Sequence, residues 1–257
     1  MISTIERHSQ IVQQVEEMGK VSVDALSHQY DVSTVTIRND LNNLDKRGLI
    51  VRFHGGATVS NGLTKELSIS QKHHQHNHIK QLLAQATAKL VNDRESIILD
   101  SGSTTEEVAL SLYSHKQLKV MTNGLNVAAK LAENNNIEVM VTGGTLRQKS
   151  LSFFDAKAEE SLTNLHFDKV ILGVDGFDLE AGITTHFSQE ASLNRLMCNI
   201  SSEIIAVTDS SKFGKRGCHI ISAYNKITTL VTDSGIPDDY AEKLTKAGVQ
   251  LCIVNEA

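Results

Sequence analysis

Residues 33–41 read STVTIRNDL, and across a turn at Asp31-Val32 they follow a short segment, 23–30, with its apolar residues on one helical side. Ser33 is a residue type that caps helix N-termini, so a helix is predicted from there to about Leu44. We expect its apolar side chains to pack inward: Val35, Ile37, Leu41 and Leu44. The outer face then carries Thr34, Thr36, Arg38 and Asn39. This pattern predicts a helix-turn-helix, whose second helix presents hydrogen-bonding groups to DNA.

Two features flank this pair of helices. Upstream, residues 6–18 have the pattern of an amphipathic helix that ends at Gly19, and its apolar face comprises Ile11, Val12, Val15 and Met18. Downstream, the apolar runs 49–51 and 57–59 surround Gly55-Gly56, which predicts a hairpin wing with Arg52 and His54 near its tip, within reach of DNA. The pattern alone leaves open an ordinary three-helix bundle with a solvated face. Basic residues outnumber acidic ones between Ser33 and His54, although the whole chain has a net charge of −5, and this favours DNA binding.

These residues resemble the DNA-binding domain of the DeoR family of bacterial regulators. The resemblance rests on residues 32–41, Leu44 and residues 52–57, and it covers nearly all of the first sixty residues. It implies that one set of side chains faces DNA: Ser33, Thr34, Thr36, Arg38 and Asn39. It also implies that Arg52 supports them from the wing. Asn39 stands where many members carry a basic residue, so the operator sequence of those members does not carry over.

A polar segment without periodicity follows the wing. We predict a winged helix-turn-helix domain over residues 1–59, a linker over 60–78 and a sensor domain over 79–257. Residues 73–78 contain four histidines, and His74 and His78 would share one helix face, a spacing seen in metal sites. No Cys, Asp or Glu lies inside the cluster, so a solvated start of the next helix is preferred and no bound metal is expected. That helix is predicted from its apolar residues: Ile79, Leu82, Leu83, Ala86 and Leu90.

From Ile97 onward short apolar runs alternate with helical patterns. The runs lie at 97–99, 118–121, 139–141, 170–172, 204–207, 230–231 and 251–254. Such alternation predicts a parallel sheet with helices on both faces, and ligands of such sheets bind beyond the carboxyl ends of the strands. The fold class is therefore α/β, with a small winged domain in front.

Small and hydroxylated residues gather at those strand ends. The loop Ser101, Gly102, Ser103, Thr104 and Thr105 lies between a strand and a helix, where free N–H groups and hydroxyls suit a phosphate. Lys212, after a later strand, adds a cation. Four residues could bond sugar hydroxyls: Asp100, Asn123, Asp175 and Glu190. Each also has a plainer interpretation as a cap, a loop brace, a solvated residue or, for Lys212, a partner of Asp209. Neither GxxxxGK[ST] nor GxGxxG occurs in this loop, so no nucleotide cofactor is expected.

The second half also resembles the DeoR family, in its sensor domain, which is related to ribose-5-phosphate isomerase. The matching stretches are 100–105, 122–123, 142–144, 175–176, 190–191 and 209–212, which add Gly143 and Gly144 to the candidate effector site. The resemblance implies that residues 101–105 and Lys212 lie at a phosphate and that Asp100, Asp175 and Glu190 lie near a sugar. Within the family, residues 190–195 are similar to the branch that controls N-acetylgalactosamine and galactosamine uptake.

Three functions are weighed for this chain. A regulator, with repression as the family expectation, would bind double-stranded operator DNA as a homo-oligomer, a dimer or tetramer, and release it when a phosphorylated sugar binds. A sugar-phosphate isomerase fused to a DNA-binding domain would need a cation beside its base, and residues 179–189 contain no Lys or Arg. A pure interaction module would not need a loop suited to anions. The regulator is preferred, and no enzymatic activity is expected.

The composition also indicates in which cellular compartment the protein is expected. Three widely spaced cysteines and no CxxC pair favour a reducing compartment, and no run approaches the ~20 apolar residues that span a bilayer. The opening residues are polar and amphipathic rather than those of a signal peptide. We therefore expect a cytoplasmic protein with no membrane contact.

Overall fold

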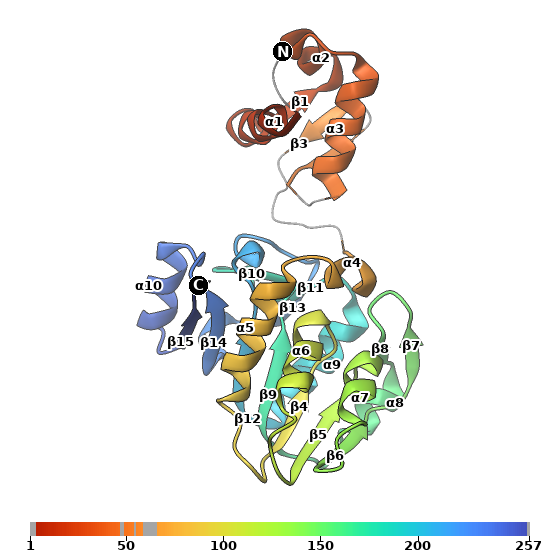
Figure 1. Cartoon of the computed structure of the whole chain (residues 1–257), viewed down its shortest axis with the longest axis vertical. Coiled ribbons are helices and arrows are strands. Elements are labelled where there is room, and N and C mark those ends of the chain that lie inside the picture. Colours follow the sequence, from red (N-terminus) through yellow and green to blue (C-terminus); the bar gives the residue numbers. More distant parts are fainter. Residues whose placement is uncertain (1–3, 47–48, 54, 59–65, 256–257) are drawn as a thin grey trace. The chain divides into compact units, whose positions relative to one another are not determined.

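A computed structural model describes residues 4–46, 49–53, 55–58 and 66–255 of the 257-residue chain. The chain divides into two compact units, Met1–Lys65 and Glu66–Ala257 (Figure 1). The second unit begins thirteen residues before the sensor domain predicted from the sequence. The sequence-based boundaries at 59 and 78 therefore stay a prediction, and each unit is described by itself below.

Within its described residues, the N-terminal unit has three helices and three short strands. Their order is α1 (Thr4–Met18), β1 (Lys20–Ser22), α2 (Val23–Tyr30), α3 (Thr34–Lys46), β2 (Val51–Phe53) and β3 (Gly56–Thr58). Ser22 caps α2 by accepting a hydrogen bond from the Ala25 amide, and Ser33 accepts one from the Thr36 amide at 3.1 Å, as expected for a cap. Asp31, in a left-handed conformation (φ 51°), turns the chain between α2 and α3. The unit therefore has the predicted helix–turn–helix order.

Two apolar residues of this unit were placed wrongly by the sequence pattern. Val35 is 60% exposed and Met18 is 64% exposed, whereas both were expected inside. On α3 the buried apolar side chains are Ile37, Leu41 and Leu44, at spacings of four and three. Val35 precedes Ile37 by two residues, which is more than half a helical turn, so it points away from the core. Met18 is the last residue of α1, immediately before the turn at Gly19 (φ 77°).

A three-stranded antiparallel sheet, in the order β1-β3-β2, completes the unit. The hairpin of β2 and β3 is the predicted wing, and the third strand, β1, was not predicted. Gly56 allows the close approach of β1 and β3, because a Cβ atom built there would lie 2.1 Å from the Val21 carbonyl oxygen. Glycine at this position is thus a packing requirement of the wing.

Seven parallel strands form the sheet of the C-terminal unit, in the order β15-β14-β12-β9-β4-β5-β6. Their bounds are β4 (Ser96–Leu99), β5 (Leu118–Thr122), β6 (Ile137–Val141), β9 (Phe167–Gly173), β12 (Ser201–Val207), β14 (Thr229–Asp233) and β15 (Gln250–Val254). Each contains one of the seven apolar runs found in the sequence. The predicted α/β parallel sheet is therefore confirmed.

Helices cover both faces of this sheet (Figure 1). Their bounds are α5 (Asn77–Ala88), α6 (Ser103–Ser111), α7 (Leu125–Leu131), α8 (Ala156–Glu160), α9 (Ser188–Asn199) and α10 (Asp238–Lys246). Successive strand residues face opposite sides, so Ile97 and Leu99 join one apolar cluster with α5, α6 and α7. Ile98 joins the other, which includes residues of α8, α9 and α10. The sheet is thus buried on both faces, as parallel sheets require.

Smaller elements surround the carboxyl edge of the sheet, and none of them was predicted from the sequence. They are the hairpin of β7 (Thr145–Arg147) and β8 (Ser152–Phe154), the antiparallel strands β10 (Gly176–Asp178), β11 (Gly182–Thr185) and β13 (His219–Ser222), and the short helices η1 (Ser210–Lys212) and η2 (Tyr224–Lys226). Their strands have three or four residues, too few for a period-two pattern to stand out.

The segment before α5 differs most from expectation. Residues 66–78 were predicted to be part of a linker, but they pack within the C-terminal unit and include the helix α4 (Ile69–His73). Ser68 and Gln71 form a capping box at its start, and Ile69 is buried. His74 and His78 do not share a helix face, because α4 ends at His73 and His76 has a left-handed backbone (φ 52°) before α5 begins.

Candidate functional site

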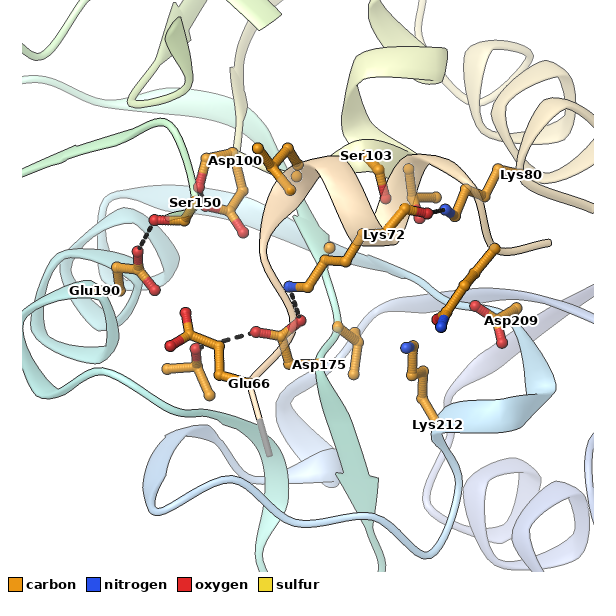
Figure 2. A pocket seen from close by; sticks show the side chains of 18 of the residues that line it. Glu66, Lys72, Lys80, Asp100, Ser103, Ser150, Asp175, Glu190, Asp209 and Lys212 are labelled. Carbon is orange, nitrogen blue, oxygen red and sulfur yellow. Dashed lines mark hydrogen bonds and ion pairs between the residues drawn. The ribbon is translucent and has the colours of Figure 1, made fainter. Parts of the chain in front are cut away.

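A pocket lies in the C-terminal unit where β4, β9 and β12 end. Asp100, Asp175 and Asp209 follow these three strands and line it, together with the start of α6 and the segment that contains α4 (Figure 2). The pocket's polar groups divide into two ends. One end holds lysines, a helix start and the carboxylate of Asp209, and the other holds Asp100 and Glu190.

The first end contains Lys80 of α5, Lys212 of η1 and Ser103 at the first turn of α6 (Figure 2). Gly102 precedes that helix with φ 150°, and no side chain caps the helix. The N–H groups of a first helical turn carry partial positive charge and attract anions. Burial lowers the pKa of the Lys80 ammonium to about 8; Asp209 opposes this shift, and the neighbouring Lys212 and Lys72 add to it. This end therefore combines positive charge with hydrogen-bond donors.

Asp100, Asn194 and Glu190 are buried at the other end. Burial, reinforced by the negative charge of Glu190, raises the pKa of Asp100 to about 8, so its carboxyl group is mainly protonated at neutral pH. Asn194 donates to the Asp100 carboxyl group at 3.3 Å, and the Asn194 Oδ1 atom is buried without a hydrogen-bond partner. A neutral acid beside a free amide oxygen can bind a ligand hydroxyl as either donor or acceptor.

Asp175 lies between the two ends and forms an ion pair with Lys72 of α4 (Figure 2). Burial alone would raise the pKa of Asp175, but the Lys72 ammonium outweighs burial and brings it to about 2. For Lys72, burial would lower the pKa, and Asp175 raises it above its usual value. The pair is therefore ionised at neutral pH. The sequence analysis found no cation in residues 179–189, and the structure supplies one from a segment about a hundred residues earlier.

Glu66 and Arg147 form a second charged contact at the pocket. Arg147 Nη2 donates to Glu66 at 2.6 Å, and Nη1 of the same guanidinium lies 3.3 Å from Glu190. Ser150 also donates to Glu190, at 2.6 Å. Burial would raise the pKa of Glu66, but the hydrogen bond from Arg147 holds it below its usual value. The β7–β8 hairpin therefore links the start of the α4 segment to Glu190 of α9.

The predicted effector residues divide into two groups in the structure. Those that line the pocket are Asp100, Ser101, Gly102, Ser103, Thr104, Asp175, Glu190 and Lys212. Those outside its lining are Thr105, Asn123, Gly143 and Gly144. Thr105 donates to the Gly102 carbonyl, and Asn123 accepts from the Ser101 amide at 2.9 Å, so both shape the loop from behind. Gly144 is packed against the Phe154 carbonyl, 2.5 Å from where a Cβ atom would lie. Binding of an effector by any of these residues stays a prediction.

Several residues of the pocket were missed by the sequence analysis: Glu66, Lys72, Lys80, Ser150, Asn194 and Asp209. Two of them, Glu66 and Lys72, belong to the segment that was assigned to a linker. The lysines flank a histidine-rich stretch, and no motif distinguished them from solvated charges. Only the fold brings them next to strand ends.

On the N-terminal unit, Arg38 and Asn39 of α3 are exposed, as expected for side chains that face DNA. The Ser33 hydroxyl bonds the Thr36 hydroxyl at 2.9 Å in addition to capping the helix. Arg52 of the wing donates to Asn42 of α3, and its amide donates to Asp45 at 3.2 Å. Arg52 therefore ties the wing to α3. His54 lies outside the described residues.

Asp40 fixes the orientation of α3 from its inner side. Its carboxylate accepts from Arg7 Nε at 2.7 Å and lies 2.8 Å from His8 Nε2, both on α1. Burial would raise the pKa of Asp40, but the hydrogen bonds from Arg7 and His8 hold it below its usual value. A buried carboxylate with two cross-helix partners positions the outer face of the same helix.

Comparison with known families identifies both units. The DeoR-like helix-turn-helix domain matches residues 7–62, and the DeoR C-terminal sensor domain matches residues 75–234. The chain belongs to the DeoR family. The DeoR sensor domain thus contains most of the pocket, and the helix-turn-helix match contains α1, α2, α3 and the wing.

Curated relatives of this DeoR-family chain match it over nearly its full length. A protein of Escherichia coli O157:H7 named as an aga operon transcriptional repressor is 46% identical over 98% of this chain and 95% of its own. The regulator GlpR of Haloferax volcanii is 33% identical over 95% of both chains. The glycerol-3-phosphate regulon repressor of Escherichia coli K12 is 29% identical over 96% of this chain and 97% of its own.

Among solved structures, ribose 5-phosphate isomerase from Plasmodium falciparum is 18% identical to the chain, with a TM-score of 0.41. It covers 53% of this chain and 53% of its own. Structural similarity at this TM-score and identity supports no conclusion about the chemistry of this chain. Within the part of the chain that the structure describes, no three His, Cys, Asp or Glu residues are grouped to hold a metal ion, and no helix is long and apolar enough to cross a membrane.

Proposed function

We propose that this protein is a transcriptional repressor of a carbohydrate-utilisation operon and that a phosphorylated sugar or amino sugar releases it from its operator. One observation carries the proposal: the pocket has lysines and a helix start at one end and sugar-binding groups at the other. This arrangement stands in a chain whose other unit is a DeoR-like helix-turn-helix domain.

The lysine end suits a phosphate group. Lys80 and Lys212 supply charge, and the first turn of α6 with Ser103 and Thr104 supplies donors. Charge-assisted hydrogen bonds to phosphate are about twice as strong as neutral ones. An unphosphorylated sugar cannot form these charge-assisted bonds, so the phosphorylated form should bind much more tightly.

The carboxyl end suits hydroxyl or amino groups of a sugar. Asp100, Asp175, Glu190 and Asn194 all line it. The relative named for the aga operon, together with the similarity of residues 190–195, favours an amino-sugar phosphate as the effector. Since we propose that the protein binds operator DNA, we also propose that it acts in the cytoplasm.

The DNA-binding unit would act as part of a homo-oligomer. A single small domain makes few phosphate contacts and binds DNA weakly at physiological salt, so a dimer or tetramer on repeated half-sites is proposed. Ser33, Thr34, Thr36, Arg38 and Asn39 would face the major groove, with Arg52 and His54 acting from the wing. Effector binding would favour a state in which the two half-sites are no longer matched.

An isomerase function is less well supported by the same pocket. Turnover needs a carboxylate free to take a proton near neutral pH. Asp100 is mainly protonated, Asp175 is held ionised by Lys72 with a pKa of about 2, and Glu190 is engaged by Arg147 and Ser150. We therefore propose that the pocket senses a sugar phosphate without converting it.

Fluorescence anisotropy on the protein's own upstream DNA tests this function. At fixed salt, amino-sugar, hexose, pentose and alditol phosphates are each added to the complex, beside their unphosphorylated sugars. Release by one phosphate, but not by its free sugar, is the expected result. DNA binding that no phosphate alters would overturn the effector proposal, and no DNA binding would overturn the whole function.

A further inference from the structure

The segment from Glu66 to His73 lies across the pocket and is held there by polar contacts at several points (Figure 2). Glu66 pairs with Arg147, and the Ile69 amide donates to the Lys149 carbonyl at 2.8 Å. Lys72 pairs with Asp175 at the centre of the pocket. This segment directly follows Lys65, the last residue of the DNA-binding unit.

The far end of α4 is tied to the phosphate end of the pocket. Lys80 donates a hydrogen bond from its ammonium to the Lys72 carbonyl oxygen. Lys80 is buried and lines the pocket near Lys212 and Asp209. The two contacts of Lys72, by its side chain and by its carbonyl, therefore use Asp175 at the centre of the pocket and Lys80 at its phosphate end.

The Lys72 side chain also occupies the space that a ligand needs. The remaining cavity is about 60 Å³, whereas sites for small molecules are typically ~300 Å³ or more. A sugar phosphate larger than this cavity would have to displace groups that now fill the pocket. Among them, Lys72 stands on a short helix of five residues, α4, in which only Ile69 is buried.

We infer that Lys72 is the residue that couples the pocket to the DNA-binding unit: a phosphorylated sugar displaces Lys72 from Asp175 and draws Lys80 from the Lys72 carbonyl, and α4 then leaves the pocket. This inference rests on the proposed function. It explains how binding of a sugar phosphate in the pocket changes the segment that continues into the DNA-binding unit. A ligand shifts such an equilibrium only by binding one state better, and here that state is the one with α4 released.

The two contacts make the response depend on both parts of the ligand. A sugar without phosphate engages Asp175 but leaves the Lys80 contact intact. Inorganic phosphate engages Lys80 and Lys212 but leaves the Lys72–Asp175 pair intact. Only a molecule with both groups breaks both contacts in a single binding event, so neither half should release DNA when added alone.

The substitution Lys72→Met in the full chain tests the inference, because the half-release concentration should fall if Lys72 competes with the ligand and rise if Lys72 binds it. In wild-type protein the ligand must compete with Lys72 for Asp175, and the variant removes this competition. The concentration of galactosamine 6-phosphate or N-acetylgalactosamine 6-phosphate that releases half of the DNA should fall about tenfold, the factor that corresponds to one charged contact. Operator affinity without ligand should stay equal or fall.

Lys246→Met is the matched control. Lys246 is also an ion-paired lysine, with Glu242 on α10, but it is 72% exposed and lies outside the pocket lining. Its half-release concentration should equal that of the wild type. If Lys72 instead binds the ligand directly, Lys72→Met raises the half-release concentration, and that result, like an unchanged value, overturns the inference.

Amide hydrogen exchange gives a second measurement that does not depend on the sugar. In ligand-free Lys72→Met, residues 69–73 should exchange faster than in the wild type, while α5 and α6 keep their protection. In wild-type protein with a releasing sugar phosphate, the same residues should exchange faster although the pocket loops exchange more slowly. Unchanged exchange of 69–73 in the ligand-free variant rejects the coupling role of Lys72. If neither phosphate binds wild-type protein in calorimetry, the proposed effector class fails, and the exchange result still decides the role of Lys72.

Discussion

The two functional regions of this protein are built in opposite ways. The candidate DNA-binding residues lie mainly at one helix, α3, where Ser33 to Asn39 span seven positions of the sequence, and Arg52 and His54 add to them from the wing. The pocket collects side chains from Glu66 to Ile221, at the ends of strands and from helices between them. A surface on one helix needs only that helix to be held in place. A pocket needs the whole sheet, so changes in the two regions should have separable effects.

The largest expected effect concerns what holds α3 in place. Asp40→Ala leaves Arg7 buried without its partner, and removing one member of a buried ion pair costs about 3–5 kcal/mol. Urea unfolding followed by circular dichroism should show an early transition for the N-terminal unit, with the later transition unchanged. Asn43→Ala, exposed on the same helix, should change neither by more than ~0.5 kcal/mol. A single shared transition for Asp40→Ala would contradict the separation of the two regions.

A large effect on the effector response alone is expected from the pocket. Lys212→Ala removes a cation of the pocket that we propose contacts the phosphate, a change of about 1.5–3 kcal/mol, so the half-release concentration should rise about tenfold to a hundredfold. Operator affinity without ligand should not change. Lys243→Ala, exposed on α10, is the control and should behave as wild type. Loss of operator affinity in Lys212→Ala would show that the pocket and the DNA face cannot be separated.

The converse variant acts on the DNA face. Arg38→Ala removes an exposed guanidinium that we propose contacts a base or phosphate, a change of about 1–3 kcal/mol. Anisotropy should show operator binding about tenfold to a hundredfold weaker, while calorimetry shows unchanged affinity for the sugar phosphate. Arg94→Ala, on the C-terminal unit, supplies the same charge change as a control. Equal operator affinity in both variants would remove α3 as the recognition helix.

The smallest expected effect is a pH dependence confined to the pocket. Burial lowers the pKa of Lys80 to about 8, and a phosphate binds its charged form. The half-release concentration should therefore be flat between about pH 7 and 7.5 and rise above pH 8, by at most tenfold per pH unit for the Lys80 proton. The Asp100 carboxyl group, whose pKa is also about 8, adds to the rise where it ionises. Lys80→Arg keeps its charge and should remove the part of the rise that is due to Lys80. Operator binding without ligand serves as the reference at each pH. An equal rise of the half-release concentration in the wild type and in Lys80→Arg would assign the titration to another group.

Local sequence patterns were sufficient to predict an element wherever a single segment contains all the residues that define it. Each of the seven strands of the main sheet contains a predicted apolar run, and α2 has the predicted bounds because its cap and turn residues are adjacent in sequence. The same reasoning misplaced Val35, since apolar character alone does not show on which side of a helix a residue lies. It also missed β1, whose three residues are too few for a periodic pattern.

For the pocket, the sequence predicted several of the loops that line it, but not the contacts between their side chains. Residues 101–104 and Lys212 were found because small, hydroxylated and basic residues follow strands, which is a local feature. Lys72 and Glu66 were taken as linker residues because their segment is polar and aperiodic. Their partners, Asp175 and Arg147, lie 103 and 81 residues away along the chain.

By itself, therefore, the sequence determined the family, the helix-turn-helix and the parallel sheet, since caps, turns and hydrophobic periodicity act between residues a few positions apart. The tertiary structure alone decided that α4 lies in the pocket, that Lys72 supplies the cation beside Asp175, and that Asp100 is mainly protonated. Ion pairing and desolvation depend on distance in space and on the exclusion of water. Both are set only when remote segments pack together.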